Sequence, residues 1–314
     1  MSQSSVPNPP TGRPPTGRSA DGEPADTAHE PAEATGNATA PALPDAVLIA
    51  AFEGWNDAGD ASTGAIEHLE EVWEATPVAA VDPDDYYDFQ VNRPTVSFVD
   101  GLTRVIQWPT TRLSRATVSG REIVLVRGLE PNMRWSGFCQ ELLALAGELG
   151  VGSVVMLGAL LADTPHTRPV PVSGTASDPD TGEAIGLERS RYEGPTGIVG
   201  VFQEAAGREG LPAVSFWAAV PHYVAQPPCP KATLALLRRV EDLLDVTVPL
   251  GDLAEQARAW ERGVDELARE DSDVQEYVRA LEQREAETEL PEASGESIAR
   301  EFERYLRRRG NDRG

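Results

Sequence analysis

Short apolar runs recur along the middle of the chain, and most of them are followed by a segment with helical spacing. Residues 46–52 read AVLIAAF, 121–128 read REIVLVRG, 151–160 read VGSVVMLGAL and 211–220 read LPAVSFWAAV. An uninterrupted apolar run of this length is typical of a strand that is covered on both faces. Such strands, alternating with helices, predict an α/β fold in which a mostly parallel sheet lies between two layers of helices.

The segments between these runs complete the predicted order of elements. Helices are expected over 60–76, 133–150, 197–210 and 231–244. Asp60 is the expected N-cap of the first helix. Further strands are expected over 77–83, in a hairpin over 95–109 that turns at Asp100-Gly101, and at a sheet edge within 167–177, where the prolines suit an edge position.

The composition changes toward both ends of the chain. Residues 1–43 are rich in Pro, Ser, Thr, Gly and Ala and have almost nothing to bury, so they are expected to be a disordered tail. Residues 44–249 form the predicted α/β core, 250–309 a C-terminal helical extension of three charged amphipathic helices, and 310–314 a short disordered tail. In the first of these helices an apolar stripe predicts a packing face: Leu253, Ala257, Trp260, Val264 and Leu267.

Charge and cysteine content exclude several classes of function. The net charge of −24 opposes binding to nucleic acid or to an anionic membrane surface, because both would repel the chain. Lys231 is the single lysine, which disfavours nucleotide chemistry that needs several lysines. Cys139 and Cys229 are expected to be reduced thiols rather than a disulfide. No stretch has the length of a membrane span or the pattern of a signal peptide, so a cytoplasmic protein is expected.

The turn that follows the first strand is the most unusual local sequence, FEGWNDAGD over 52–60. Gly54 and Gly59 have the GxxxxG spacing of a phosphate loop, but Asp60-Ala61 follows where Lys and Ser or Thr would be needed. Glu53, Asp57 and Asp60 would already offset the partial positive charge of the helix N-terminus. The turn is therefore predicted to be a capped strand-to-helix junction and not a phosphate cradle.

Polar side chains also follow the other predicted strands. Because the carboxyl ends of parallel strands share one edge of a sheet, a polar rim is expected there. If the chain is an enzyme, the candidate catalytic residues for general acid–base work are Glu53, Asp57, Glu130, His166 and His222. The candidate ligand-binding residues are Trp55, Asn56, Arg127, Arg168, Thr196 and Tyr223. The simpler hypothesis is that each histidine hydrogen-bonds its own loop, and neither a metal site nor a cofactor is expected.

Five spaced motifs resemble one known family. EGWNDAGDAST, RGLEPNMRW, LGALLADTPHTRPVPVSG, YEGPTGIVG and SFWAAVPHYV, followed by SGESIAREFERYLR, are similar to the proteasome assembly chaperone 2 family in its actinobacterial branch. The resemblance covers about residues 44–309. It implies a three-layer α/β fold like that of purine nucleoside phosphorylases, and association into homo-oligomers, in some members trimers.

The same resemblance implies a partner. Eukaryotic and archaeal relatives assist assembly of the proteasome α-ring, and several dock through a C-terminal hydrophobic-Tyr-any tripeptide. This sequence ends RRRGNDRG and differs from that pattern, so docking through such a tripeptide is not expected.

Two functions stay open from the sequence. The first is a non-catalytic assembly or interaction protein with proteasome subunits and further copies of itself as partners. The alternative is a small-molecule-binding protein, or a hydrolase-like or phosphorylase-like enzyme, with its site at the carboxyl ends of the strands. A third possibility is a homo-oligomer in which the FEGWNDAGD turn lies at a subunit boundary.

Overall fold

The computed structural model describes residues 46–187, 190 and 192–289 of the chain, and its centre is a seven-stranded sheet. The strand order is β2-β5-β6-β1-β7-β9-β8. Four central strands run parallel: β6 (Arg121–Leu129), β1 (Ala46–Glu53), β7 (Ser153–Ala162) and β9 (Ala213–Pro221). The antiparallel strands lie at the two edges: β5 (Arg112–Val118) and β2 (Thr76–Ala80) at one, and β8 (Val172–Ala176) at the other.

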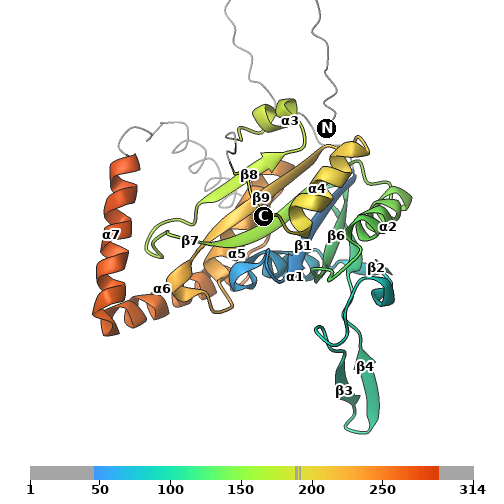
Figure 1. Cartoon of the computed structure of the whole chain (residues 1–314), viewed down its shortest axis with the longest axis horizontal. Helices are drawn as coiled ribbons and strands as arrows, with labels where there is room; N and C mark the ends of the chain where they lie inside the picture. The colour runs from blue at the N-terminus through green and yellow to red at the C-terminus, as the bar shows by residue number, and fades with distance from the viewer. Residues whose placement is uncertain (1–45, 188–189, 191, 290–314) are drawn as a thin grey trace, which may run out of the picture. The chain divides into compact units, whose positions relative to one another are not determined.

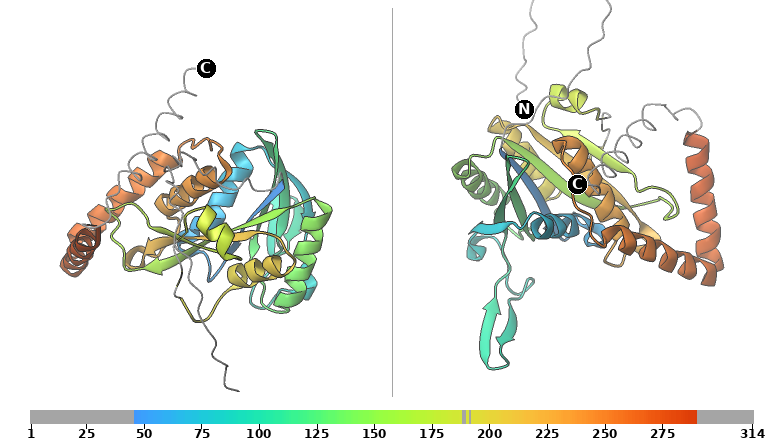
Figure 2. Two further views of the ribbon diagram at one scale, coloured as in Figure 1. Left: turned by 90° about the horizontal axis from the view of Figure 1, so that it is seen from above. Right: turned by 180° about the vertical axis from the view of Figure 1, so that it is seen from behind.

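Two layers of helices cover this sheet, which confirms the predicted three-layer α/β fold (Figures 1 and 2). The helices α1 (Ala61–Val72) and α5 (Pro230–Leu244) pack on one face, and α2 (Trp135–Glu148) and α4 (Ile198–Arg208) pack on the other. Strand β1 serves both layers, because successive side chains of a strand point to opposite faces. Val47, Ile49 and Ala51 join the first core, whereas Leu48, Ala50 and Phe52 join the second.

The predicted hairpin and edge strand are both present. Strands β3 (Thr95–Val99) and β4 (Thr103–Gln107) pair antiparallel as a separate two-stranded sheet. Asp100 and Gly101 both have positive φ, 53° and 71°, as the tightest hairpin turns require. Two short elements were not predicted: β5, in which few large apolar residues mark the strand, and α3 (Pro179–Ala184), which Asp178 caps.

Two long helices end the described part of the chain, α6 (Leu253–Glu270) and α7 (Ser272–Glu289). The stripe predicted on α6 is buried at Leu253, Ala257 and Val264, but Leu267 is 58% exposed, and the buried face ends at Ala268 instead. None of the described helices is long and apolar enough to cross a membrane. The predicted third helix and both predicted tails lie outside the described residues. The division into a core over 44–249 and a helical extension over 250–309 stays a prediction.

The carboxyl ends of the four parallel strands lie at one edge of the sheet, as expected. The turn after β1 lies between two of these ends, because main-chain hydrogen bonds join it to both. The Glu130 amide after β6 donates to the Glu53 carbonyl oxygen at 2.9 Å, and the Ala159 amide of β7 donates to the Asn56 carbonyl oxygen at 2.8 Å. The FEGWNDAGD turn is therefore built into the sheet edge.

Candidate functional site

Asp57 is the residue that holds the turn onto helix α1. Its carboxylate is 5% exposed and accepts hydrogen bonds from the Ser62 amide and the Ser62 hydroxyl, both at 2.6 Å. It also accepts from the amide and the hydroxyl of Thr63. The predicted position of Asp60 as the N-cap of this helix is confirmed, but the side-chain capping bond expected there is absent. Asp60 occupies the N-cap position with a left-handed backbone, φ 49°, and makes no side-chain capping bond. The carboxylate three residues earlier satisfies the free amides instead.

Asn56 of the turn contacts Glu130, which follows β6. The Asn56 side-chain amide donates to Glu130 Oε1 at 2.7 Å, and the Ile198 main-chain amide donates to the same oxygen at 2.9 Å. Glu130 therefore also neutralises the N-terminus of α4. Asn56 is fully buried, and a Cβ added at Gly197 would lie 2.1 Å from its Oδ1 atom. One carboxylate thus connects three segments: the β1 turn, the end of β6 and the start of α4.

Arg127 and Glu53 lie on the side of the turn that faces α1. The Arg127 guanidinium pairs with Glu70 at 3.0 Å and with Glu67 at 3.6 Å. A cation that is already shared by two glutamates is a weak anchor for a ligand phosphate. Burial raises the pKa of Glu53 above its ordinary value, the nearby Arg127 lowers it, and the Asp57 charge adds to the rise.

A large cavity opens beside the turn, at the edge of the sheet toward β8. Its volume is about 1410 Å³. Trp55, which is 64% exposed, and Thr196 line it, and both were predicted to bind a ligand. The other sides come from the ends of β7 and from β8 and β9, including Leu161, Ser173 and Trp217.

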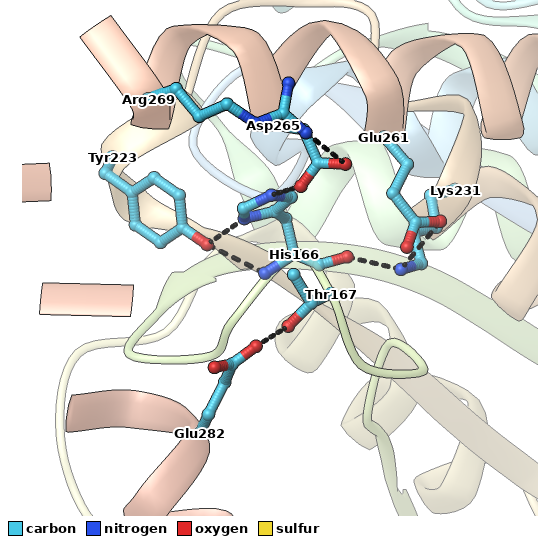
Figure 3. A network of polar contacts seen from close by, with 8 residues as sticks. All are labelled: His166, Thr167, Tyr223, Lys231, Glu261, Asp265, Arg269 and Glu282. Atoms are coloured by element: carbon cyan, nitrogen blue, oxygen red, sulfur yellow. Dashed lines mark hydrogen bonds and ion pairs between the residues drawn. The ribbon is translucent and has the colours of Figure 1, made fainter. Parts of the chain in front are cut away.

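His166 occupies a different position from the one expected. Its side chain is almost completely buried, with Nδ1 2.7 Å from the Tyr223 hydroxyl and Nε2 3.2 Å from Asp265 Oδ1 of α6 (Figure 3). The His166 main-chain amide donates to the same Tyr223 hydroxyl at 2.7 Å. Its carbonyl oxygen accepts from Lys231, which also pairs with Glu261 of α6 at 3.3 Å.

His222 belongs to the same region and contacts α7. Its Nδ1 lies 3.4 Å from Asp163, and its ring meets the ring of Tyr277 edge-on at a centroid distance of 5.2 Å. Thr167 donates to Glu282 of α7 at 2.5 Å. The loop after β7 and the turn after β9 therefore bind α6 and α7. Arg168 lies in this loop and is half-buried.

The predicted polar rim thus divides into two clusters with different partners. Asn56, Asp57 and Glu130 connect the β1 turn to α1 and α4, whereas His166 and Tyr223 connect the core to α6. No group of three His, Cys, Asp or Glu side chains in the described part of the chain is placed to hold a metal ion. The predicted catalytic and ligand roles of these residues stay predictions. The contacts of Lys231 and Asp265 with His166 were not predicted. Asp265 lies 99 positions from His166 in the sequence, and no local pattern indicates such a pair.

Comparison with known proteins identifies the family that has this architecture. A model of the PAC2 family matches residues 51–268, from β1 to within α6. The chain belongs to the PAC2 family. No curated protein sequence matches it.

Two solved structures of PAC2-type proteins from actinobacteria are close in sequence. A PAC2 family protein from Streptomyces avermitilis is 65% identical, with a TM-score of 0.71 over 74% of this chain and 99% of that chain. A proteasome-assembly chaperone homologue from Mycobacterium tuberculosis is 60% identical, with a TM-score of 0.69 over 74% of this chain and 99% of that chain. The recognition of the family from its motifs is confirmed.

A more distant archaeal protein shares the PAC2 fold. The archaeal proteasome activator PbaB from Pyrococcus furiosus is 16% identical, with a TM-score of 0.60 over 72% of this chain and 95% of that chain. At that identity the likeness shows the fold alone. The PAC2 match includes both clusters of the rim but ends before α7, so the contacts of Tyr277 and Glu282 lie beyond it.

Proposed function

We propose that this chain is a non-catalytic assembly or interaction protein of the proteasome-assembly-chaperone type. The observation that carries this proposal is the 60% identity to the mycobacterial proteasome-assembly chaperone homologue, over 74% of this chain and 99% of that one. Its partners would be proteasome subunits in the cytoplasm and further copies of the chain in a homo-oligomer such as a trimer.

The geometry at three of the five candidate catalytic residues supports a structural role over catalysis, whereas Glu53 and His222 are exposed. A general base needs a carboxylate or imidazole that can reach a substrate proton. The Asp57 carboxylate accepts bonds from Ser62 and Thr63 and is nearly buried, and Glu130 Oε1 is shared by Asn56 and the α4 amide. The His166 ring is closed off from solvent. These contacts are those of groups that hold elements together.

The test is assembly of a proteasome in the presence of the full chain. Affinity-tagged protein is co-expressed with proteasome α and β subunits of an actinobacterium, and the bound material is analysed by native gel and mass spectrometry. We expect the tagged chain to capture α subunits or incompletely assembled rings, and not the mature proteasome. An acidic protein of similar net charge serves as the control bait, because a charge of −24 captures basic proteins without specificity. Equal recovery of proteasome subunits on the two baits in high salt would contradict the proposal.

A second candidate function is small-molecule binding at the cavity beside the turn. The favouring observation is its volume of about 1410 Å³, with Trp55 and Tyr192 exposed at its wall. Thermal-shift screening with nucleosides, inorganic phosphate and divalent metal ions tests it. Stabilisation by a nucleoside that disappears in Trp55→Ala but persists in Met133→Ala would support this function. The Met133 side chain is exposed and does not line the cavity, so this variant controls for loss of a surface apolar group.

A further inference from the structure

The cavity beside the β1 turn has apolar side chains on its wall that nothing in the described part of the chain covers. Trp55, Leu161 and Tyr192 line it and are 64%, 50% and 69% exposed. Large apolar side chains gathered around one hollow mark a binding surface, because their exposure to water costs free energy. The cavity volume of about 1410 Å³ is larger than the roughly 300–1,000 Å³ of most small-molecule sites, and it suits a segment of polypeptide.

The mouth of this cavity is acidic. Asp60 lines it and is exposed, and two further exposed carboxylates, Asp163 and Glu193, lie within two residues of the wall in the sequence. Arg239 is the one cationic side chain among the described residues that line the cavity. Its guanidinium lies over the Phe216 ring, 5.1 Å from the ring centroid. The cavity therefore favours an apolar occupant that also carries positive charge.

One segment outside the described residues has this chemistry. Residues 298–309, here called the basic segment, read IAREFERYLRRR. Five arginines against two glutamates give it a net charge of +3, in a chain whose total is −24. Its apolar residues Ile298, Phe302, Tyr305 and Leu306 have the i, i+4, i+7, i+8 spacing of one helix face, and most of its arginines belong to the other faces. The basic segment thus combines an apolar stripe with positive charge, as the cavity and its mouth require.

The chain is long enough to bring the basic segment to the cavity of the same copy. Thr167 donates to Glu282 of α7 at 2.5 Å, and Pro171, four residues after Thr167, lines the cavity (Figure 3). The end of α7 lies about 10 Å along the helix beyond Glu282, and Thr167 lies at most about 14 Å from Pro171. Residues 290–297 span up to about 28 Å when extended, and the basic segment adds about 18 Å as a helix. The cavity is therefore within reach of the basic segment of its own chain.

We propose that the basic segment binds as a helix in the cavity beside the β1 turn of the same chain. Phe302 and Leu306 become buried against the apolar wall, and the arginines face the acidic mouth. The cavity wall and the apolar stripe are then covered together and exposed together. The inference assigns the cavity to the chain itself rather than to a small molecule, and it does not depend on the proteasome as partner.

Cross-linking within the full chain tests the position of the basic segment. The test variant is Leu161→Cys with Glu301→Cys, treated with a short bismaleimide at low micromolar protein concentration. Its matched control is Val78→Cys with Glu301→Cys, because Val78 is also an exposed apolar strand residue but lies on β2, at the opposite edge of the sheet. The native cysteines are buried and stay in both proteins. Circular dichroism shows whether each variant is folded.

We expect the test variant to form at least about tenfold more intramolecular cross-link than the control, because docking raises the effective concentration of the two thiols. Peptide mass spectrometry identifies the linked residues, and a denaturing gel separates single chains from linked pairs. A yield equal to that of the control would overturn the proposal. Cross-links that join two chains and not one would overturn it too, and would assign the cavity to the segment of a neighbouring copy.

Hydrogen exchange is an independent measurement on chains without added cysteines. Phe302→Ser with Leu306→Ser removes the apolar stripe, and we expect peptides from the β1 turn and the end of β7 to exchange at least about threefold faster than in wild type. The matched control is Arg300→Ser with Glu303→Ser, which lies off the stripe and keeps the net charge of the segment. The control should exchange like wild type. Equal exchange at the cavity in the stripe variant and in wild type would overturn the proposal.

Discussion

At the scale of single residues, Asp57 is the side chain on which the β1 turn most depends. We expect Asp57→Ala to lower the free energy of unfolding by about 2–4 kcal/mol, because the amides and hydroxyls of Ser62 and Thr63 lose their acceptor in a buried place. Urea unfolding followed by fluorescence measures this. Asp60→Asn is the control and should change stability by less than about 0.5 kcal/mol, since Asp60 is exposed and makes no side-chain capping bond. An equal loss in both variants would contradict the assignment.

The sequence could show that this turn is a capped junction but not which carboxylate caps it. From the sequence, Asp57 and Asp60 are equally plausible as the capping residue, because both precede the helix and both are short acidic side chains. The choice is made by the left-handed backbone at Gly59 and Asp60, which moves the start of α1 past Asp60 and leaves Asp57 facing Ser62 and Thr63. Positive φ at a non-glycine residue is not readable from composition.

Glu53 gives a prediction about pH. Burial, with a contribution from the Asp57 charge, raises its folded-state pKa, so the folded protein holds the proton more tightly than the unfolded chain does. Ionisation therefore costs stability as the pH rises through the ordinary value for Glu, and the full cost remains above the raised pKa. We expect Glu53→Gln to raise the melting temperature at neutral pH by about 1–2 °C, and this gain to vanish below about pH 3.5, where Glu53 is protonated in both the folded and the unfolded state.

Glu122→Gln is the matched control with the opposite sign. Hydrogen bonds from Thr117 and Arg115 lower the pKa of Glu122, so its charged form favours the folded state above its ordinary pKa and this benefit is lost as the pH falls. The control should therefore melt no higher than wild type at neutral pH. Calorimetric melts of both variants across pH measure the comparison, and a gain of the same sign in the two would contradict it.

At the scale of elements, His166 fastens the C-terminal helices to the core. We expect His166→Ala to increase hydrogen exchange in α6 and α7 by about tenfold or more, while β1 and β6 keep wild-type rates. The reason is that removal of the buried ring breaks the bridge from Tyr223 to Asp265 of α6. Mass spectrometry of exchanged peptides measures it. Glu204→Gln, which breaks an exposed ion pair on α4, is the control and should leave both regions unchanged.

Much of the fold could be predicted because its strands are apolar enough to show as runs. The ends of β1, β6, β7 and β9 were predicted to share one edge, and they do. The sequence could not show that α6 and α7 pack over part of that edge, where α6 contacts His166 and α7 contacts His222. Helix α6 is amphipathic, but its pattern does not name the loop on which it packs. The candidate residues therefore lie at the expected edge but in two clusters, and their functional roles stay predictions.

At the scale of the whole molecule, the dominant property is a net charge of −24 on 314 residues. Such a charge opposes the compact state, because folding brings like charges closer together than they are in the extended chain. Added salt shortens the Debye length from roughly 20 Å at low salt to a few ångströms near 1 M, and so removes this penalty. The described ion pairs act in the opposite direction, but most are exposed and contribute little.

We therefore expect the melting temperature to rise by several degrees between about 0.02 and 0.5 M sodium chloride at neutral pH. Self-association would also raise it, since binding of folded copies stabilises the folded state. The measurement is therefore made at two low micromolar protein concentrations, because a contribution from self-association changes with protein concentration. A rise of the same size at both concentrations isolates the effect of intramolecular repulsion. A melting temperature that falls with salt would show instead that ion pairs such as Arg127 with Glu70 outweigh the net charge.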